Sequence, residues 1–285
     1  MTFIDSLRNY LSPQILVILC LGFISGVPYG VLMDPLNYWL SEEGIEKSTI
    51  GLLSLVFLIY SLKVFWAPLV DRLKIPGLHS LGQRKSWLFL SQFVTGLIIL
   101  SISFFEPKES LNIFVYLILA IGFFSATQDI CADALRIELV EKRELGEASA
   151  VFVIGWRIGA ILLSGVATFY LAELFGWSFA YQMIGLIVIF LSFIFLILIR
   201  EPTREIRPPK DFFKEPLGWF EDSFLAPLKD LYLRYKNHLL LLLLLIFTYR
   251  LSDMFLGPMA MPFYRETGFT KIEVAEITNF YGLIM

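Results

Sequence analysis

The chain has 285 residues, of which 57% are hydrophobic and only 17% are charged, and its mean hydropathy is +0.71. Soluble domains carry about 45–50% apolar and about 25% charged residues. This composition therefore excludes a single core surrounded by water and indicates a protein embedded in a lipid bilayer. The formal net charge of −3 offers little attraction to a phosphate backbone, and we expect no nucleic-acid partner.

Side chains that carry chemistry are sparse outside the apolar runs. Cys20, Cys131, His79 and His238 stand singly and lack the spacing of metal ligands, so the two cysteines are interpreted as packing residues. The sequence shows neither a nucleophile with its base nor a phosphate-cradling loop. We therefore expect no metal, no cofactor and no enzyme activity.

The apolar residues form long runs, and about 20 apolar residues are needed to cross a bilayer as a helix. We predict an all-α membrane protein with about seven to eight membrane-spanning helices. The spans are expected at 13–33, 49–70, 86–105, 111–133, 148–172, 177–199 and 238–260, with an eighth beginning near 274. The first run is too long for a cleaved signal peptide and is followed at once by another span, so we interpret it as a retained helix.

A long polar stretch after the sixth span divides the chain. Residues 1–200 are predicted to form a six-helix bundle, residues 201–237 a cytoplasmic loop, and residues 238–285 the incomplete start of a second bundle. The loop contains five prolines together with charged and aromatic residues. Two interpretations stay open for it, namely a plain interdomain linker or an amphipathic helix lying on the inner leaflet.

The placement of lysine and arginine predicts the orientation. With the N-terminus in the cytoplasm, sixteen of the 23 basic residues lie in inner segments and four in outer ones. Because cytoplasmic loops carry the excess of basic residues, we expect a multi-pass protein with a cytoplasmic N-terminus.

The loop between the second and third spans combines an acidic helix end with basic residues. Asp71 and Arg72 end one run, and Arg84 and Lys85 precede the next. Charge-assisted hydrogen bonds between such groups form a latch that opens when helix bundles move. An ordinary basic inner loop is the alternative interpretation.

The fourth span places two carboxylates on one face, because Asp129 and Asp133 are four residues apart, with Gln128 beside them. Ionisable groups within a span usually face a bundle interior or a water-filled cavity. We interpret them as a site for substrate or for proton exchange near neutral pH. Alternatively, Asp133 lies at the helix end and pairs with Arg136.

Charges in two other spans are further candidates. Arg157 lies deep in the fifth span and is expected either to pair with Asp129 or to bind an anionic group of a substrate. Arg250 and Asp253 in the seventh span are three apart, which is also compatible with a simple intrahelical ion pair. Lys63 adds a further charge at membrane depth.

Several of these segments together resemble one family. The motifs are Trp-Leu-Ser-Glu-Glu-Gly at 39–44, Thr-Ile-Gly-Leu-Leu-Ser-Leu at 49–55, the Lys-to-Asp-Arg run at 63–72, Ser-Ala-Thr-Gln-Asp-Ile at 125–130 and Gly-Trp-Arg-Ile-Gly at 155–159. In this combination the chain is similar to the AmpG family of bacterial muropeptide permeases, within the major facilitator superfamily. Ala67 and Gln83 replace a glycine and an arginine of the superfamily's loop signature.

The resemblance implies a proton-driven importer of anhydro-muropeptides in the bacterial inner membrane. On this basis Asp129 is expected to act in proton coupling or substrate contact, and Arg157 to bind a carboxylate of the cargo. Another anionic metabolite, such as acetyl-coenzyme A, is the alternative cargo.

Members of the family have twelve spans, whereas this sequence ends within the eighth. Three explanations follow: a fragment of a longer protein, one part of a split transporter whose remaining helices come from a second chain, or a remnant without transport activity.

Overall fold

The fold is that of a computed structural model, which describes residues 12–199, 201, 215, 218, 220, 221 and 225–276. For part of the helix Leu239–Glu266, Arg250 and Asp253 included, the backbone alone is described. Statements below concern these residues. All regular elements among them are helical, which confirms the predicted all-α class.

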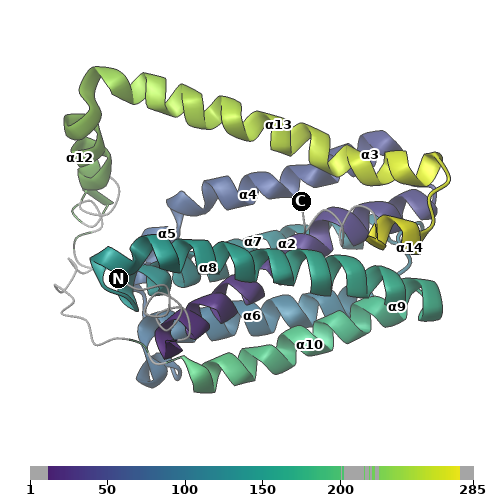
Figure 1. The fold of residues 1–285 in the computed structure, drawn as a ribbon, viewed down its shortest axis with the longest axis horizontal. Coiled ribbons are helices and arrows are strands. Elements are labelled where there is room, and N and C mark those ends of the chain that lie inside the picture. The colour runs from purple at the N-terminus through teal and green to yellow at the C-terminus, as the bar shows by residue number, and fades with distance from the viewer. Residues whose placement is uncertain are drawn as a thin grey trace, which may run out of the picture.

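Six helical segments are long and apolar enough to cross a membrane, and they lie side by side in Figure 1. Three are single helices: α2 (Pro13–Glu42), α6 (Gln83–Ile102) and α7 (Leu111–Glu138). The second span, Lys47–Phe65, is built from α3 (Lys47–Leu53), η1 (Ser54–Val56), α4 (Phe57–Leu62) and η2 (Lys63–Phe65). The fifth, Lys142–Phe175, consists of η4 (Lys142–Glu144), α8 (Leu145–Arg157), the π-helical η5 (Ile158–Ala167) and α9 (Thr168–Phe175), and the sixth is α10 (Trp177–Leu198).

These segments confirm the first six predicted spans but correct their limits. The first helix runs on to Glu42, nine residues past the predicted end, although Pro28 and Pro35 lie inside it. The second was predicted to reach residue 70, yet it ends at Phe65, and Ala67–Arg72 forms a separate helix, α5. Pro68 explains this break, because proline has no N–H to continue the preceding helix but fits a first turn.

Local signals fix the other ends. The hydroxyl of Ser12 accepts a hydrogen bond from the Ile15 N–H, and Pro13 occupies the first turn of α2. Gly176 has a φ of 89° and separates α9 from α10. A residue with a Cβ would be strained there, so this glycine allows the sharp reversal between the fifth and sixth spans.

The remaining described elements follow the sixth span. They are α12 (Ala226–Tyr235), η7 (Lys236–His238), α13 (Leu239–Glu266) and α14 (Lys271–Val274), while η3 (His79–Leu81) lies earlier, between α5 and α6. The predicted seventh span thus corresponds to α13, which runs six residues further than expected. The predicted eighth starts three residues early, at Lys271, and residues 277–285 lie outside the described residues.

The first span is the centre of the bundle. It packs against α8 and η5 through glycines on both sides: an added Cβ at Gly22 or Gly26 would collide with the carbonyl oxygens of Phe152 and Trp156, respectively. Gly155 and Gly159 approach the first span in the same way from the opposite side. Small residues let helix backbones come close in a membrane, where van der Waals packing replaces the hydrophobic effect as the force between helices.

Two apolar clusters fill the interior, one towards each end of the bundle. We call the end at which α2 begins the N-terminal end, and the other the distal end. Near the distal end Trp39 stacks on Trp177 with ring centroids 5.8 Å apart, and Phe114 meets Trp39 edge-on. Many large apolar side chains point outwards instead, among them Phe190 and Ile197 of α10, which is the surface expected of helices surrounded by lipid.

Candidate functional site

A charged cluster lies where η2 meets α7. Lys63 Nζ is 3.1 Å from Asp133 Oδ2 and 3.9 Å from Asp129 Oδ2. Asp133 also pairs with Arg136 one turn along α7, at 3.4 Å. One cation is therefore shared by two carboxylates that come from the same helix face, as their four-residue spacing predicted.

The cluster is only partly buried. The side chains of Lys63 and Asp129 are 28% and 20% exposed, and that of Asp133 is 42% exposed. A charge at membrane depth is costly unless it is paired or reaches water. Here both conditions are met in part, because Lys63 offsets one of the two negative charges and all three side chains remain partly exposed.

Hydrogen bonds fix α7 in position around this cluster. The Tyr60 hydroxyl donates to Ser125 Oγ at 3.0 Å, and the Trp66 indole donates to Thr127 Oγ1 at 3.0 Å. The two bonds hold residues on either side of Lys63, one within the second span and one just after it, against α7. The carboxylates and their cation are thus held together by the same pair of helices.

Gln128 faces the first span rather than the open face of the cluster. Its side chain is fully buried and donates a hydrogen bond of 2.9 Å to the Ile24 carbonyl. The buried hydroxyl of Ser25, the next residue on α2, lies beside Asp129. Gln128 was predicted as a site residue. In the structure its hydrogen bond joins α7 to α2.

Aromatic rings border the cluster. Tyr29 of α2 lies 4.8 Å from Phe57, 5.5 Å from Tyr60 and 5.2 Å from Trp156, measured between ring centroids. These rings come from α2, α4 and α8. Together with the charged cluster they form one polar and aromatic wall to which the first, second, fourth and fifth spans contribute.

Arg157 does not pair with Asp129. It is the last residue of α8, its side chain is exposed, and among the described residues it forms no ion pair. The counter-charge of Asp129 is instead Lys63. Sequence reasoning noted the lysine but not its partner, because the two are 66 residues apart in the chain. The second predicted role of Arg157, the binding of an anionic group of a substrate, stays a prediction.

The candidates of the seventh span have no described side chains. The backbone of α13 passes through Arg250 and Asp253, but both side chains lie outside the described residues.

A second charged group joins the helix ends at the N-terminal end of the bundle. Arg84 Nη2 is 3.2 Å from Asp71 Oδ1, and Arg84 Nη1 is 2.9 Å from Glu138 Oε1 at the end of α7. Its side chain is only 9% exposed. The backbone N–H groups of Arg84 and Lys85 donate to the carboxylate of Glu201 at 3.2 and 3.1 Å.

This arrangement brings together the predicted latch residues Asp71 and Arg84, and adds Glu138 and Glu201, which sequence reasoning missed. Glu201 sits at the start of α6, where the helix dipole favours a negative charge. The helix α5, the third and fourth spans and the segment after the sixth span are thus connected at one end. Lys85 contributes its backbone N–H here, and Arg72 is the residue next to Asp71 at the end of α5.

At the distal end, the segment after α13 is bound to the first bundle. Lys271 Nζ lies 3.1 Å from Glu42 Oε2 and 5.2 Å from the centroid of the Trp177 ring. Lys47 pairs with Glu266 at 2.6 Å, and the Tyr38 hydroxyl donates to the Phe269 carbonyl at 2.9 Å. These contacts join the start of the second group of helices to α2, α3 and α10.

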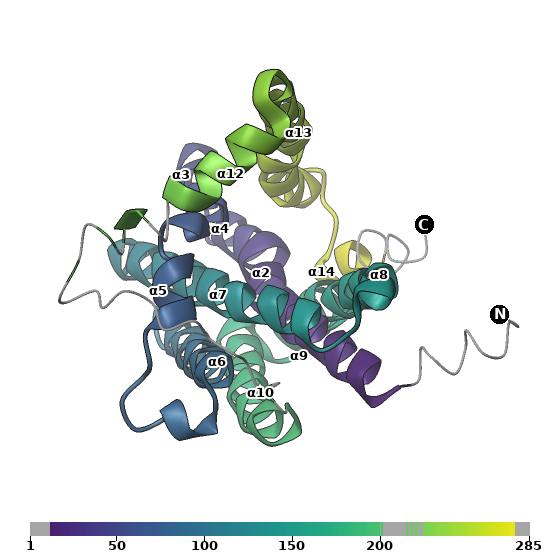
Figure 2. The ribbon, with the colours of Figure 1, turned by 90° about the vertical axis from the view of Figure 1, so that its left-hand side faces the viewer.

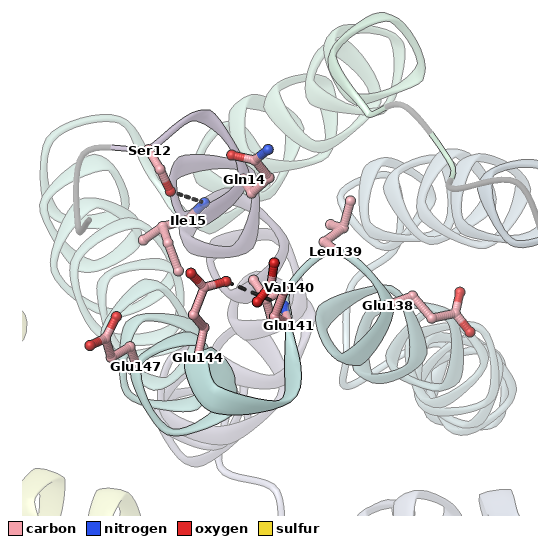
Figure 3. A pocket seen from close by; sticks show the side chains of 9 residues that line it. All are labelled: Ser12, Gln14, Ile15, Glu138, Leu139, Val140, Glu141, Glu144 and Glu147. Carbon is pink, nitrogen blue, oxygen red and sulfur yellow. Dashed lines mark hydrogen bonds between the residues drawn. The ribbon is translucent and has the colours of Figure 1, made fainter. Parts of the chain in front are cut away.

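A cavity of about 420 Å³ opens at the N-terminal end, between the start of α2 and the turn from α7 to α8 (Figure 3). Among the described residues, its lining includes four glutamates and no cation: Glu138, Glu141, Glu144 and Glu147. Glu141 and Glu144 form a reciprocal capping box, which accounts for their placement. The charged cluster at Lys63 does not line this cavity, and among the described residues no group of His, Cys, Asp or Glu could hold a metal ion.

Six membrane-length helices around a polar wall define a polytopic helical membrane protein with the architecture of a transporter. The profile of the Major Facilitator Superfamily matches residues 16–285, and the chain belongs to this family. This confirms the predicted superfamily and fold.

Two relatives give the comparison more detail. The AmpG 4 protein of Rickettsia conorii is 39% identical over 94% of this chain and 63% of its own length. The anhydromuropeptide permease of Escherichia coli K12 is 33% identical over 98% of this chain and 54% of its own length. The predicted AmpG-type resemblance is confirmed, and these relatives are a transporter and a permease rather than enzymes.

A solved structure shares the fold. A bacterial homologue of the human lysosomal transporter Spinster has a TM-score of 0.64 and 17% identity, covering 97% of this chain and 59% of its own. The chain thus covers between about half and two thirds of the length of each of these three proteins.

Proposed function

We propose that the chain belongs to a secondary transporter that imports anhydro-muropeptides across the bacterial inner membrane, driven by protons. The observation that carries the proposal is the sharing of Lys63 between Asp129 and Asp133 on a half-exposed wall. The similarity to the permease named for anhydromuropeptide supports the choice of cargo. The proposed partners are this cargo, protons, the bilayer and a second chain that supplies further helices.

The charged cluster suits an exchange between a proton and a ligand. When both carboxylates are ionised, Lys63 is held by them and is unavailable to a ligand. Protonation of one carboxylate leaves a single counter-charge, so Lys63 becomes able to attract an anionic group of the cargo. Arg157, whose side chain is exposed, supplies a second cation with a planar fork suited to carboxylates.

The two ends of the bundle suit alternating access. The ion pairs of Lys271 and Lys47 join segments that are far apart in the sequence at the distal end, and in this proposal they keep that end closed. The count of basic residues supports placing the N-terminal end in the cytoplasm. We propose that the distal contacts break and the Arg84 latch rearranges when the wall turns outwards. The domain division at residues 200 and 237 is part of this proposal.

The test is uptake of labelled anhydro-muropeptide by cells that lack their own permease, with and without a proton uncoupler. We expect uncoupler-sensitive uptake with the wild-type chain, a loss with Asp129→Asn, and no change with Glu109→Gln, an exposed carboxylate between the third and fourth spans. An uptake rate that is the same with and without the uncoupler would refute proton coupling. No uptake by membrane-inserted protein, alone or with a second chain that supplies further helices, would refute the cargo.

A further inference from the structure

The short helix α12 lies across the ends of the spans instead of along them. In Figure 1 it stands at the end of the molecule where α13 begins, and in Figure 2, which looks at that end, it crosses the view while α13 is seen nearly end-on. Only the three residues of η7 separate it from α13. The helix is therefore at the level where the seventh span begins.

The turn between the two helices is built into the backbone. Lys236 has a φ of 41°, and among the described residues it is the one non-glycine position with a positive φ. This conformation is uncommon for a residue with a Cβ. Its N–H still closes the last turn of α12 by donating to the Tyr232 carbonyl. The chain thus ends α12 and changes direction at a single residue.

The sequence of this helix is amphipathic. Leu225, Leu228, Leu231, Tyr232 and Tyr235 recur at spacings of three and four, which places them on one face. The opposite face carries an ion pair of 2.8 Å between Asp230 and Arg234. Segment 225–238 holds three basic residues and one acidic residue.

Much of the apolar face is uncovered within the described protein. Tyr232, Leu225 and Tyr235 are 59%, 50% and 44% exposed, and the main contacts of α12 are with η7 and α13. An uncovered apolar face of this kind is unfavourable in water. A helix with an apolar face, basic residues and low overall hydrophobicity is suited to lie in the boundary between headgroups and acyl chains, where tyrosine is also favoured.

We propose that α12 is an interfacial helix that binds the bilayer surface at the N-terminal end, with its leucines and tyrosines among the acyl chains and its basic residues on anionic headgroups. The lipid surface is the fitting occupant because α13 enters the membrane three residues away, so the face of α12 meets lipid without any further partner. Bound in this way, α12 fixes the depth at which the seventh span begins. This proposal does not depend on the cargo.

The test compares the two faces of α12 in the full chain, with Cys20 and Cys131 replaced by alanine. A spin label is attached at Tyr232→Cys on the apolar face, or at Asp230→Cys as the matched control on the polar face, and the protein is placed in phosphatidylcholine vesicles containing phosphatidylglycerol. We expect the label at 232 to be accessible to oxygen and protected from a water-soluble nickel chelate. The label at 230 should show the reverse.

Equal exposure of both labels to the chelate would overturn the proposal in favour of a linker in water. Equal protection of both would overturn it in favour of a helix buried in protein. The same contrast in vesicles with and without phosphatidylglycerol would overturn the assignment to anionic headgroups. If replacing the native thiols disturbs folding, labelling in the native background, corrected by the unsubstituted protein, repeats the comparison.

Discussion

Lys63 is the residue on which the charged cluster depends, because it is the shared cation of two carboxylates on α7. Removing one member of a paired group leaves an uncompensated charge, which costs more than the pair itself contributes. The carboxylates were predictable from their spacing in the sequence. Their cation was not, since only the fold brings η2 against α7.

We expect Lys63→Gln to lower the rate of uptake at least about tenfold, equivalent to roughly 1.4 kcal/mol in the barrier. The same variant should unfold at a lower temperature in detergent, because Asp129 and Asp133 then repel each other. The double variant Lys63→Gln/Asp133→Asn should recover thermal stability but not uptake. Wild-type uptake by Lys63→Gln would show that the cluster has no part in transport.

Arg84 is the corresponding residue at the N-terminal end. Its buried guanidinium lies between Asp71 and Glu138, and loss of one partner from a buried ion pair costs about 3–5 kcal/mol. Because Asp71 is 41% exposed, we expect Arg84→Ala to lower the free energy of unfolding by only about 2–3 kcal/mol.

The matched control is Arg143→Ala, which removes an arginine that is 78% exposed and paired with Glu141. Its effect should stay below about 1 kcal/mol. Chemical denaturation in detergent measures both changes. Similar losses in the two variants would show that the Arg84 latch contributes no more than a surface pair.

At the scale of helices, the long apolar runs were enough to predict the six spans, but not the residues at which they begin and end. The second span ends early at Phe65 because Pro68 begins a new helix, which the continuous apolar run concealed. The fifth is longer than predicted and contains a π-helical segment, for which the sequence offers no simple signal. The close approach of Gly22 and Gly26 to the fifth span came only from the structure.

The glycine contacts between α2 and α8 can be tested by adding one methyl group. A Cβ added at Gly26 of α2 would collide with the Trp156 carbonyl. A Cβ added at Gly146 of α8 would meet nothing within 4 Å. We expect Gly26→Ala to destabilise by about 1–3 kcal/mol through overpacking. Gly146→Ala should stabilise by up to about 1 kcal/mol through helix propensity. Thermal unfolding midpoints that fall equally in both variants would contradict this account.

At the scale of the whole molecule, the two ends differ in how the segments after the sixth span meet the first bundle. The distal end is joined by Lys47–Glu266 and Lys271–Glu42. Such contacts between sequentially distant segments lie beyond what composition or periodicity predicts. Family membership, by contrast, was evident from short motifs spread along the chain.

If the distal end opens during transport, a covalent link there must stop it. We expect the variant Lys47→Cys/Glu266→Cys to lose uptake under mild oxidation and to regain it after reduction. Each single cysteine variant should be insensitive to oxidant. Full uptake by the cross-linked protein would show that these segments stay together throughout the cycle.

The π-helical segment Ile158–Ala167 has a mechanical consequence for the wall. Ser164 within it is anchored to α2 by a hydrogen bond of 2.7 Å to the Val27 carbonyl, while Arg157 stands just before it. Each residue of an α-helix turns the chain by about 100°, with a rise of 1.5 Å. If this π-helical segment converted to an α-helix with a shift of one residue, Arg157 would rotate about the helix axis by about a quarter to a third of a turn relative to Ser164. The guanidinium of Arg157 would then point in a different direction while the rest of the fifth span stayed in contact with α2.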